Sequence, residues 1–103
     1  MVARGEVWWY EPEDAGRRPV LILTRSGAIP VLNQVLGVPA SRTIRDIPTE
    51  VRLERSDGMP ARCVLALDAL MPIRPALCTK RITTLSPARM AEVCAALGLA
   101  VDC

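Results

Sequence analysis

The sequence predicts a mainly β (α+β) protein: a small, strongly curved antiparallel sheet or barrel with one helix docked on it. Three observations carry this prediction. Five short segments have the length and composition of strands, turn residues separate them, and one C-terminal segment has the caps and spacing of a helix. The chain has 103 residues, 50% hydrophobic and 23% charged, so we expect a single globular domain over residues 1–103.

The strands are predicted from apolar runs and from alternation. The five segments are residues 5–10, 19–24, 31–38, 49–55 and 62–67. In the fourth, Val51 and Leu53 alternate with charged residues, which is typical of a half-buried antiparallel strand. Pro39 closes the third run. Residues 11–18 are predicted to form a turn or short loop, and residues 68–71 a one-turn helix.

One α-helix is predicted near the end of the sequence. Ser86 is a good N-cap, Pro87 takes the first helical position, and Gly98 lies just past the expected end. Four side chains at i, i+3, i+4 and i+7 form an apolar stripe that is expected to dock on the sheet: Met90, Val93, Cys94 and Leu97.

The missing residue types exclude several kinds of chemistry. The chain has no histidine, which is the usual general base near neutral pH and the commonest zinc ligand. Its four cysteines have no C-x-x-C spacing, so we expect no metal, no cofactor, and buried, reduced thiols at Cys63, Cys78, Cys94 and Cys103. The first residues lack the apolar run of a signal peptide, and no run is long enough for a membrane span, so a cytoplasmic protein is expected.

Charge is unevenly distributed along the chain. Between Asp14 and Asp46 every charged residue is an arginine: Arg17, Arg18, Arg25, Arg42 and Arg45. Arginine binds phosphate through a planar fork of donors, so this segment favours a polyanionic partner. A compositional bias toward arginine accounts for Arg in place of Lys, but not for the absence of acidic residues.

Five motifs occur in order along nearly the whole chain. They are Gly5-Glu6-Val7-Trp8-Trp9, Arg17-Arg18-Pro19 before an apolar run, Val38-Pro39-Ala40-Ser41, Ile47-Pro48-Thr49-Glu50-Val51, and the C-terminal segment 85–99. In this order and spacing they resemble the MazF/PemK/Kid family of toxin endoribonucleases, the toxin half of type II toxin–antitoxin pairs.

The resemblance implies an SH3-like barrel, shared with the gyrase poison CcdB, and a homodimer that cuts single-stranded RNA at short sequences without metal. The target would be mRNA, or alternatively tRNA or rRNA, and cleavage would inhibit translation and growth. An acidic MazE-like antitoxin peptide is the implied protein partner, with DNA bound only through it and no membrane partner.

By position, the family's active-site arginine falls on Arg18 and its threonine on Ser41. Serine keeps the hydroxyl but loses the methyl that restricts the rotamer. The first loop, residues 11–16, is shorter than is common in the family.

The chemistry gives each candidate residue a task. In metal-free cleavage the 2′-OH attacks the adjacent phosphate and leaves a 2′,3′-cyclic phosphate and a 5′-OH. Arg18 would stabilise the phosphorane and Ser41 would bond a non-bridging oxygen. Arginine has a pKa above about 12 and is a poor base, so the acid or base is left open among Glu11, Glu13 and Asp14. The remaining candidates are expected to bind RNA: Arg17, Arg25, Arg42 and Arg45.

Trp8 and Trp9 are expected to point to opposite faces of a strand. One belongs in the core, and the other covers the core or a dimer seam or, alternatively, stacks a base.

Three functions are open on the sequence. The first is an RNA-cleaving toxin, the second a non-enzymatic protein-binding toxin like CcdB, and the third a degenerate homologue that only binds RNA or an antitoxin. The Arg-Pro and Pro-x-Ser motifs favour the first.

Overall fold

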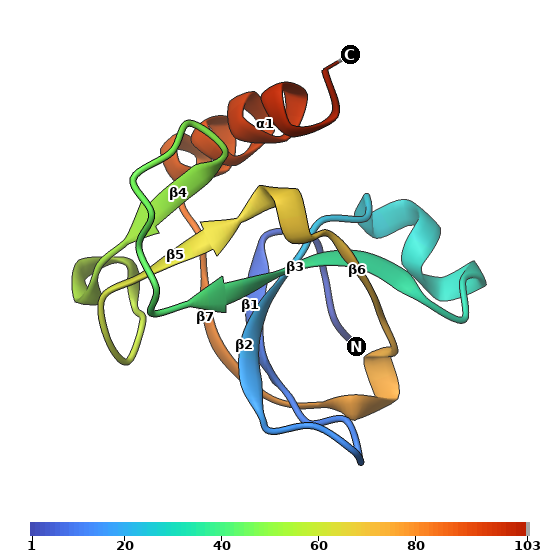
Figure 1. Ribbon diagram of the computed structural model, residues 1–103. Coiled ribbons are helices and arrows are strands. Elements are labelled where there is room, and N and C mark those ends of the chain that lie inside the picture. The colour runs from blue at the N-terminus through green and yellow to red at the C-terminus, as the bar shows by residue number, and fades with distance from the viewer. Residues whose placement is uncertain (103) are drawn as a thin grey trace.

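A computed structural model describes residues 1–102 as a strongly curved antiparallel sheet with one α-helix (Figure 1). The sheet has seven strands: β1 (Glu6–Tyr10), β2 (Arg18–Ile22), β3 (Val35–Ser41), β4 (Glu50–Leu53), β5 (Cys63–Ala66), β6 (Met71–Ile73) and β7 (Cys78–Thr84). Their order is β4-β5-β3-β2-β1-β7, with β6 pairing β3 beside this path. The sheet is therefore barrel-like but not closed, and the predicted mainly β fold is confirmed.

Short 3₁₀ helices connect the strands. They are η1 (Ser26–Val31), η2 (Arg55–Asp57), η3 (Leu67–Ala69) and η4 (Pro75–Leu77). The predicted strand over 31–38 is therefore wrong at its start, where η1 ends. The one-turn helix predicted at 68–71 is present as η3, which begins one residue earlier and ends two residues earlier than predicted.

The third strand runs through Pro39 rather than ending at it. The first half of β3 pairs with β6 through Gly37, and its last two residues, Ala40 and Ser41, pair with β5. Pro39 lies between these two ladders and pairs only with Val20 of β2. A proline that lacks an N–H is tolerated there because no second neighbour needs that donor.

Two strands were not predicted. The short β6 contains Pro72, and β7 has mostly polar or half-exposed residues on both faces, so neither shows an apolar run or a clean alternation. β7 pairs only with β1, at the edge of the sheet. An edge strand buries too little to need an apolar pattern.

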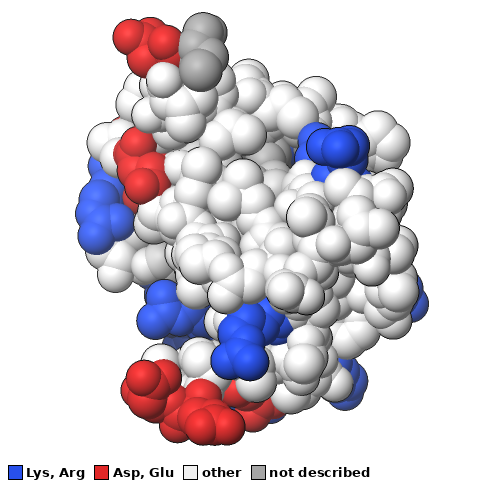
Figure 2. All heavy atoms as spheres, turned by 90° about the vertical axis from the view of Figure 1, so that its right-hand side faces the viewer, with Lys and Arg blue, Asp and Glu red and all other residues white. Residues whose placement is uncertain are grey.

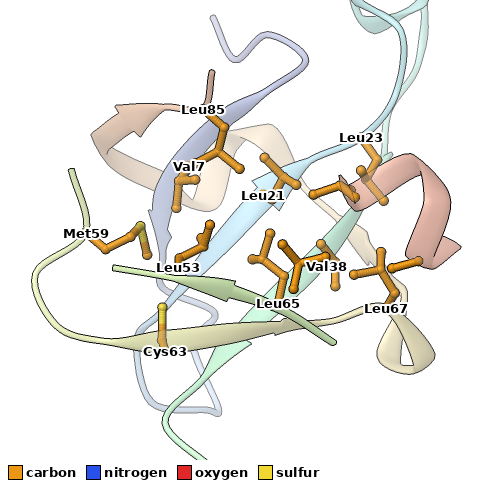
Figure 3. Close-up of a cluster of buried hydrophobic side chains, with 13 residues drawn as sticks. Val7, Leu21, Leu23, Val38, Leu53, Met59, Cys63, Leu65, Leu67 and Leu85 are labelled. Carbon is orange, nitrogen blue, oxygen red and sulfur yellow. The ribbon is translucent and has the colours of Figure 1, made fainter. Parts of the chain in front are cut away.

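Apolar side chains from both faces of β2 form the core. Leu21 belongs to a cluster that also contains Val38 and Leu65, and Figure 3 shows these three side chains, from β2, β3 and β5, directed into the same space. Val20 and Ile22 belong to a second cluster on the other face of β2. This burial on both faces explains the continuous apolar run of this strand.

The helix α1 (Pro87–Val101) begins as predicted and ends later than predicted. The Ser86 hydroxyl accepts a hydrogen bond of 3.2 Å from the backbone N–H of Arg89. The helix continues through Gly98 to Val101, and its C-cap is Asp102, which has a positive φ of 50°. No helix within residues 1–102 has the length and apolar character needed to cross a membrane.

Only part of the predicted apolar stripe is buried. Val93 is buried, and Met90 and Leu97 pack against the first core cluster, but Cys94 is exposed. Cys63 is buried and Cys78 half-buried, so the expectation that the thiols are buried is wrong for Cys94. Cys103 lies outside the described residues.

Candidate active site: an arginine-lined cleft

The pairing of β2 with β3 brings Arg18 and Ser41 together. The antiparallel ladder ends at the pair Val20 and Pro39, two residues from Arg18 on one strand and two residues from Ser41 on the other. Arg18 begins β2 and Ser41 ends β3, so both lie at the same end of the strand pair. The two residues therefore share one rim of the sheet.

Two adjoining hollows open at this rim. The first has a volume of about 370 Å³ and is lined by Trp9, Arg17, Arg18, Pro19, Ala40, Ser41, Arg42, Met59, Pro60, Ala61, Arg62 and Cys63. The second, of about 470 Å³, is lined by Gly16, Arg17, Arg18, Pro39, Ala40, Ser41, Arg45, Ala66 and Ala69. Because they share Arg17, Arg18, Ala40 and Ser41, we treat them as one site, the arginine cleft.

Arginine is the only charged residue type that lines the arginine cleft among residues 1–102. Neither hollow has an aspartate or glutamate on its wall. Five arginines line the cleft: Arg17, Arg18, Arg42, Arg45 and Arg62. A concave surface with one sign of charge concentrates ligands of the other sign. The cleft therefore suits an anion with several charges.

The arginines of the cleft differ in whether their side chains form ion pairs. Arg45 Nη1 lies 3.6 Å from Glu50 Oε2, and Arg62 Nε lies 3.1 Å from Glu54 Oε2. Within residues 1–102, the side chains of Arg18 and Arg42 make no hydrogen bond or ion pair. Arg18 thus presents an uncompensated charge and all its donors in the cleft that Ser41 also lines.

The Ser41 hydroxyl is oriented by the backbone that follows it. Its Oγ accepts a hydrogen bond of 3.1 Å from the N–H of Thr43. This contact uses one lone pair and leaves the hydroxyl proton free to be donated. Ser41 can therefore donate to an oxygen bound beside Arg18.

The thiol in the cleft is poorly suited to nucleophilic attack. Burial raises the pKa of Cys63 above its ordinary value, and the nearby carboxylates of Asp57 and Glu54 add to the effect. The thiolate is the reactive form of cysteine. Cys63 therefore remains a neutral thiol at neutral pH and forms part of the wall.

The predicted acids do not line either hollow. Glu11 accepts a hydrogen bond from the hydroxyl of Thr79, and Glu13 and Asp14 are exposed in the loop between β1 and β2. That loop reaches the cleft through Gly16, two residues after Asp14. Acidic side chains gather at the lower end of the molecule in Figure 2, where Figure 1 shows this loop.

The structure brings together Arg17, Arg18, Ser41, Arg42 and Arg45 of the predicted site. It does not place Arg25 with them, because this residue lies beyond the opposite end of β2 from Arg18. Their roles in catalysis and RNA binding stay predictions.

Sequence reasoning missed the wall formed by residues 59–62 and the contribution of Arg62. This segment directly precedes β5, and the pairing of β5 with β3, in which Val64 is the partner of Ser41, brings it to the cleft. It also missed Glu50, whose side chain is 4% exposed and organises the loop after Ser41. Within residues 1–102, no group of three or more histidine, cysteine or acidic side chains is placed to hold a metal ion.

Comparison with known proteins identifies the class of protein to which this fold and site belong. A family model described as a PemK-like, MazF-like toxin of type II toxin-antitoxin systems matches residues 3–101. The Mycobacterium tuberculosis protein named probable endoribonuclease MazF5 is 45% identical over 102 residues, which cover 98% of this chain and 94% of that protein. Probable endoribonuclease MazF2 of the same species is 35% identical over 101 residues, 97% of this chain and 98% of that protein.

Solved structures agree with this match. The Mycobacterium tuberculosis toxin MazF-mt6 has a TM-score of 0.85 at 28% identity, with 94% of this chain and 96% of that chain covered. A mycobacterial endoribonuclease in complex with its cognate antitoxin has a TM-score of 0.89 at 24% identity, with 99% of this chain and 96% of that chain covered. At this identity the match supports the fold alone. The chain belongs to the PemK-like, MazF-like toxin family, and the predicted family resemblance is confirmed.

Proposed function

We propose that this MazF-like toxin is a metal-independent endoribonuclease that cleaves single-stranded RNA at short sequences. The observation that carries the proposal is a cleft that the unpaired guanidinium of Arg18 and the side chain of Ser41 both line, together with other arginines and with no carboxylate of residues 1–102. Relatives named probable endoribonucleases, identical at 45% and 35% of aligned positions, support the same activity.

In the proposed reaction the RNA itself supplies the nucleophile. The ribose 2′-oxygen loses its proton and forms a bond to the adjacent phosphorus, the bond from phosphorus to the 5′-oxygen breaks, and the 5′-oxygen takes up a proton. The products are a 2′,3′-cyclic phosphate and a 5′-OH. Charge on the non-bridging oxygens rises in the phosphorane, and a fixed donor aimed at that charge lowers the barrier.

Each site residue has a distinct task in this reaction. Arg18 stabilises the developing charge because its donors have no internal partner, and Ser41 donates its proton to a non-bridging oxygen. Arg42 and Arg45 hold flanking phosphates. Glu11, Glu13 and Asp14 remain the alternatives for the proton transfers, in a loop that reaches the cleft through Gly16.

The test is cleavage of labelled single-stranded RNA in EDTA. We expect the wild-type protein to generate 5′-OH and cyclic-phosphate ends. Arg18→Ala should lower kcat/KM about 10²–10³-fold, the usual effect of removing one donor to a developing oxyanion. Arg55→Ala is the matched control, because Arg55 is exposed, lies outside the arginine cleft and should leave the rate unchanged.

Two results would contradict the proposal. One is RNA that stays intact with wild-type protein over varied sequences, and the other is normal cleavage by Arg18→Ala. Growth arrest that persists in Arg18→Ala without RNA fragments would instead indicate a protein-binding toxin.

The family and the charge of the cleft also indicate partners. We infer an acidic antitoxin segment that occupies the arginine cleft in place of RNA and mediates any contact with DNA. We infer a homodimer as well, supported by exposed apolar side chains in and after η1, where Val31 is 82% exposed. Figure 2 shows this side of the molecule, and uncharged residues cover most of its centre. The proposed place of action is the cytoplasm, where translated RNA is found.

A further inference from the structure

Arg17 and Trp9 form a stacked pair on the wall of the arginine cleft. The Arg17 Cζ lies 4.0 Å from the centroid of the Trp9 ring. Trp9 comes from β1, where it pairs with Pro19 of β2, and both lie on the wall of the first hollow. Its neighbour Trp8 instead packs against the second core cluster, so Trp9 is the tryptophan on the cleft side of the strand.

The stack fixes the guanidinium without using its hydrogen-bond donors. Arg45 and Arg62 are held by carboxylates, which occupy donors and cancel charge. Within residues 1–102 Arg17 has no hydrogen bond or ion pair, and its guanidinium lies over the Trp9 ring. Its edge donors are therefore positioned yet unsatisfied, which is the condition for reading a ligand by its hydrogen-bond pattern.

The first hollow, which both Arg17 and Arg18 line, offers more than phosphate-binding donors. Pro19, Met59, Pro60 and Ala61 give the first hollow, which Trp9 also lines, apolar walls. Apolar and aromatic walls suit the flat face of a base, whereas a phosphate gains nothing from them. The adjacent residue Arg18 already supplies an unpaired guanidinium for the scissile phosphate.

We propose that Arg17, supported by Trp9, is a specificity-determining residue that reads a guanine base next to the scissile phosphate. Guanine O6 and N7 present two neighbouring acceptors, and they match the fork of an arginine. The inference rests on the proposed function for the identity of the ligand, single-stranded RNA. It assigns to Arg17 a base contact in place of the phosphate contact expected for a surface arginine.

The experiment measures binding separately from cleavage. Arg18→Ala protein is incubated with a random pool of short single-stranded RNAs, and the bound fraction is sequenced. We expect enrichment of guanine at one position. The enriched RNA is then synthesised with 7-deazaguanine there, which removes the N7 acceptor, or with inosine, which keeps both N7 and O6.

For Arg18→Ala we expect 7-deazaguanine to weaken binding about 10- to 100-fold and inosine to leave it unchanged. Adding Arg17→Lys keeps the charge but removes the planar fork, so this double variant should bind guanine and 7-deazaguanine RNAs equally. Adding Arg17→Ala should give the same loss of discrimination. When Arg17→Lys is made alone, with Arg18 kept, it should relax the cleavage preference at that position while cleavage continues.

Three outcomes would overturn the inference. They are no guanine enrichment, unchanged discrimination in Arg17→Lys, and a uniform loss of binding over all sequences in Arg17→Ala with a salt dependence reduced by about one charge, as for a phosphate contact. A failure of the proposed function would look different. In that case the wild-type protein would cut no RNA, whether or not the Arg18→Ala variant selects guanine.

Discussion

Arg17 and Arg18 are neighbours in sequence, but their surroundings give them different roles. Arg17 rests on the Trp9 ring, while the side chain of Arg18 makes no hydrogen bond or ion pair within residues 1–102. Both line both hollows of the cleft. A guanidinium held by an aromatic face is suited to reading a base, and one without a partner is suited to a charge that develops during the reaction.

Another residue, Glu50, controls the loop that follows Ser41. Its Oε1 accepts hydrogen bonds of 2.9 Å and 3.1 Å from the backbone N–H groups of Arg45 and Asp46. Asp46 has a positive φ of 58°, a conformation that a side chain disfavours. Glu50 therefore acts as a positioning residue, since it stabilises this turn and holds Arg45 beside the cleft.

We expect Glu50→Ala to lower the free energy of unfolding by about 1–3 kcal/mol, because two backbone donors lose a charged acceptor. It should also raise KM for RNA, since Arg45 is no longer held beside the cleft. Urea unfolding and steady-state cleavage measure the two effects. Glu50→Gln, which keeps an acceptor oxygen, should recover most of the stability. Equal losses in the two variants would contradict this role.

At the scale of elements, a helix boundary shows where a local signal failed. Gly98 was expected to end α1, but the helix continues to Val101. A Cβ added at Gly98 would have nothing within 4 Å, so the glycine is not required by packing. The residues after it, such as Leu99 and Val101, carry no signal that stops a helix.

We expect Gly98→Ala to raise the free energy of unfolding by about 0.5–1 kcal/mol, because alanine loses less conformational entropy in a helix. Urea denaturation measures the change. Gly37→Ala is the opposite control: its Cβ would lie 2.5 Å from Ile73 Cγ1 and 2.9 Å from the carbonyl oxygen of Leu21. That variant should be destabilised by about 1–3 kcal/mol. A destabilised Gly98→Ala would show that the glycine has a role not visible in its contacts.

Strands were predictable where burial imposes a pattern. The apolar run of β2 and the alternation of β4 follow from residues buried on two faces and on one face, respectively. The edge strand β7 has no such pattern, and β3 extends through Pro39 because its neighbour changes there. Local sequence cannot report a change of partner, which depends on strands far away in the chain.

At the scale of the whole molecule, the candidate site was predictable only in part. Motifs in the sequence identify Arg18 and Ser41, and in the structure both residues line the same two hollows. The Arg17–Trp9 stack and the wall of residues 59–62 depend on how separate strands curve around one another. Their composition gives no local signal, so no reading of the sequence alone could place them at the cleft.

One ion pair connects this wall to the helix. Asp57, at the end of η2, accepts a hydrogen bond of 3.0 Å from Arg89 Nε on α1 and one of 2.7 Å from the N–H of Glu54. The Asp57 backbone carbonyl accepts from the hydroxyl of Thr83 on β7. Asp57 thus joins the start of the segment that forms the cleft wall to two other elements.

This connection should make stability depend on pH. The hydrogen bond from Arg89 holds the pKa of Asp57 below its ordinary value. Burial acts in the opposite direction, and the hydrogen bond from the Glu54 N–H adds to the lowering. The folded state therefore gains stability above the unfolded pKa of about 3.9 and loses it as the pH falls through the lower folded-state pKa. The pKa of Glu6 is also lowered, because hydrogen bonds from Trp8, Ala3 and Arg81 outweigh the larger single effect of burial, but Glu6 is present in every variant compared.

We expect Asp57→Asn to lower the free energy of unfolding by about 1–3 kcal/mol at pH 7, because a hydrogen-bonded charge is lost. The difference from wild type should begin to shrink below about pH 4, where Asp57 of the unfolded chain takes up its proton, and continue to shrink until folded Asp57 is also neutral. Urea unfolding from pH 7 to pH 3 measures it, with Asp14→Asn, an exposed carboxylate, as the control that should show no difference. A gap between Asp57→Asn and wild type that stays constant over this range would mean that the side chain acts through shape alone, and that its charge does not connect the cleft wall to the helix.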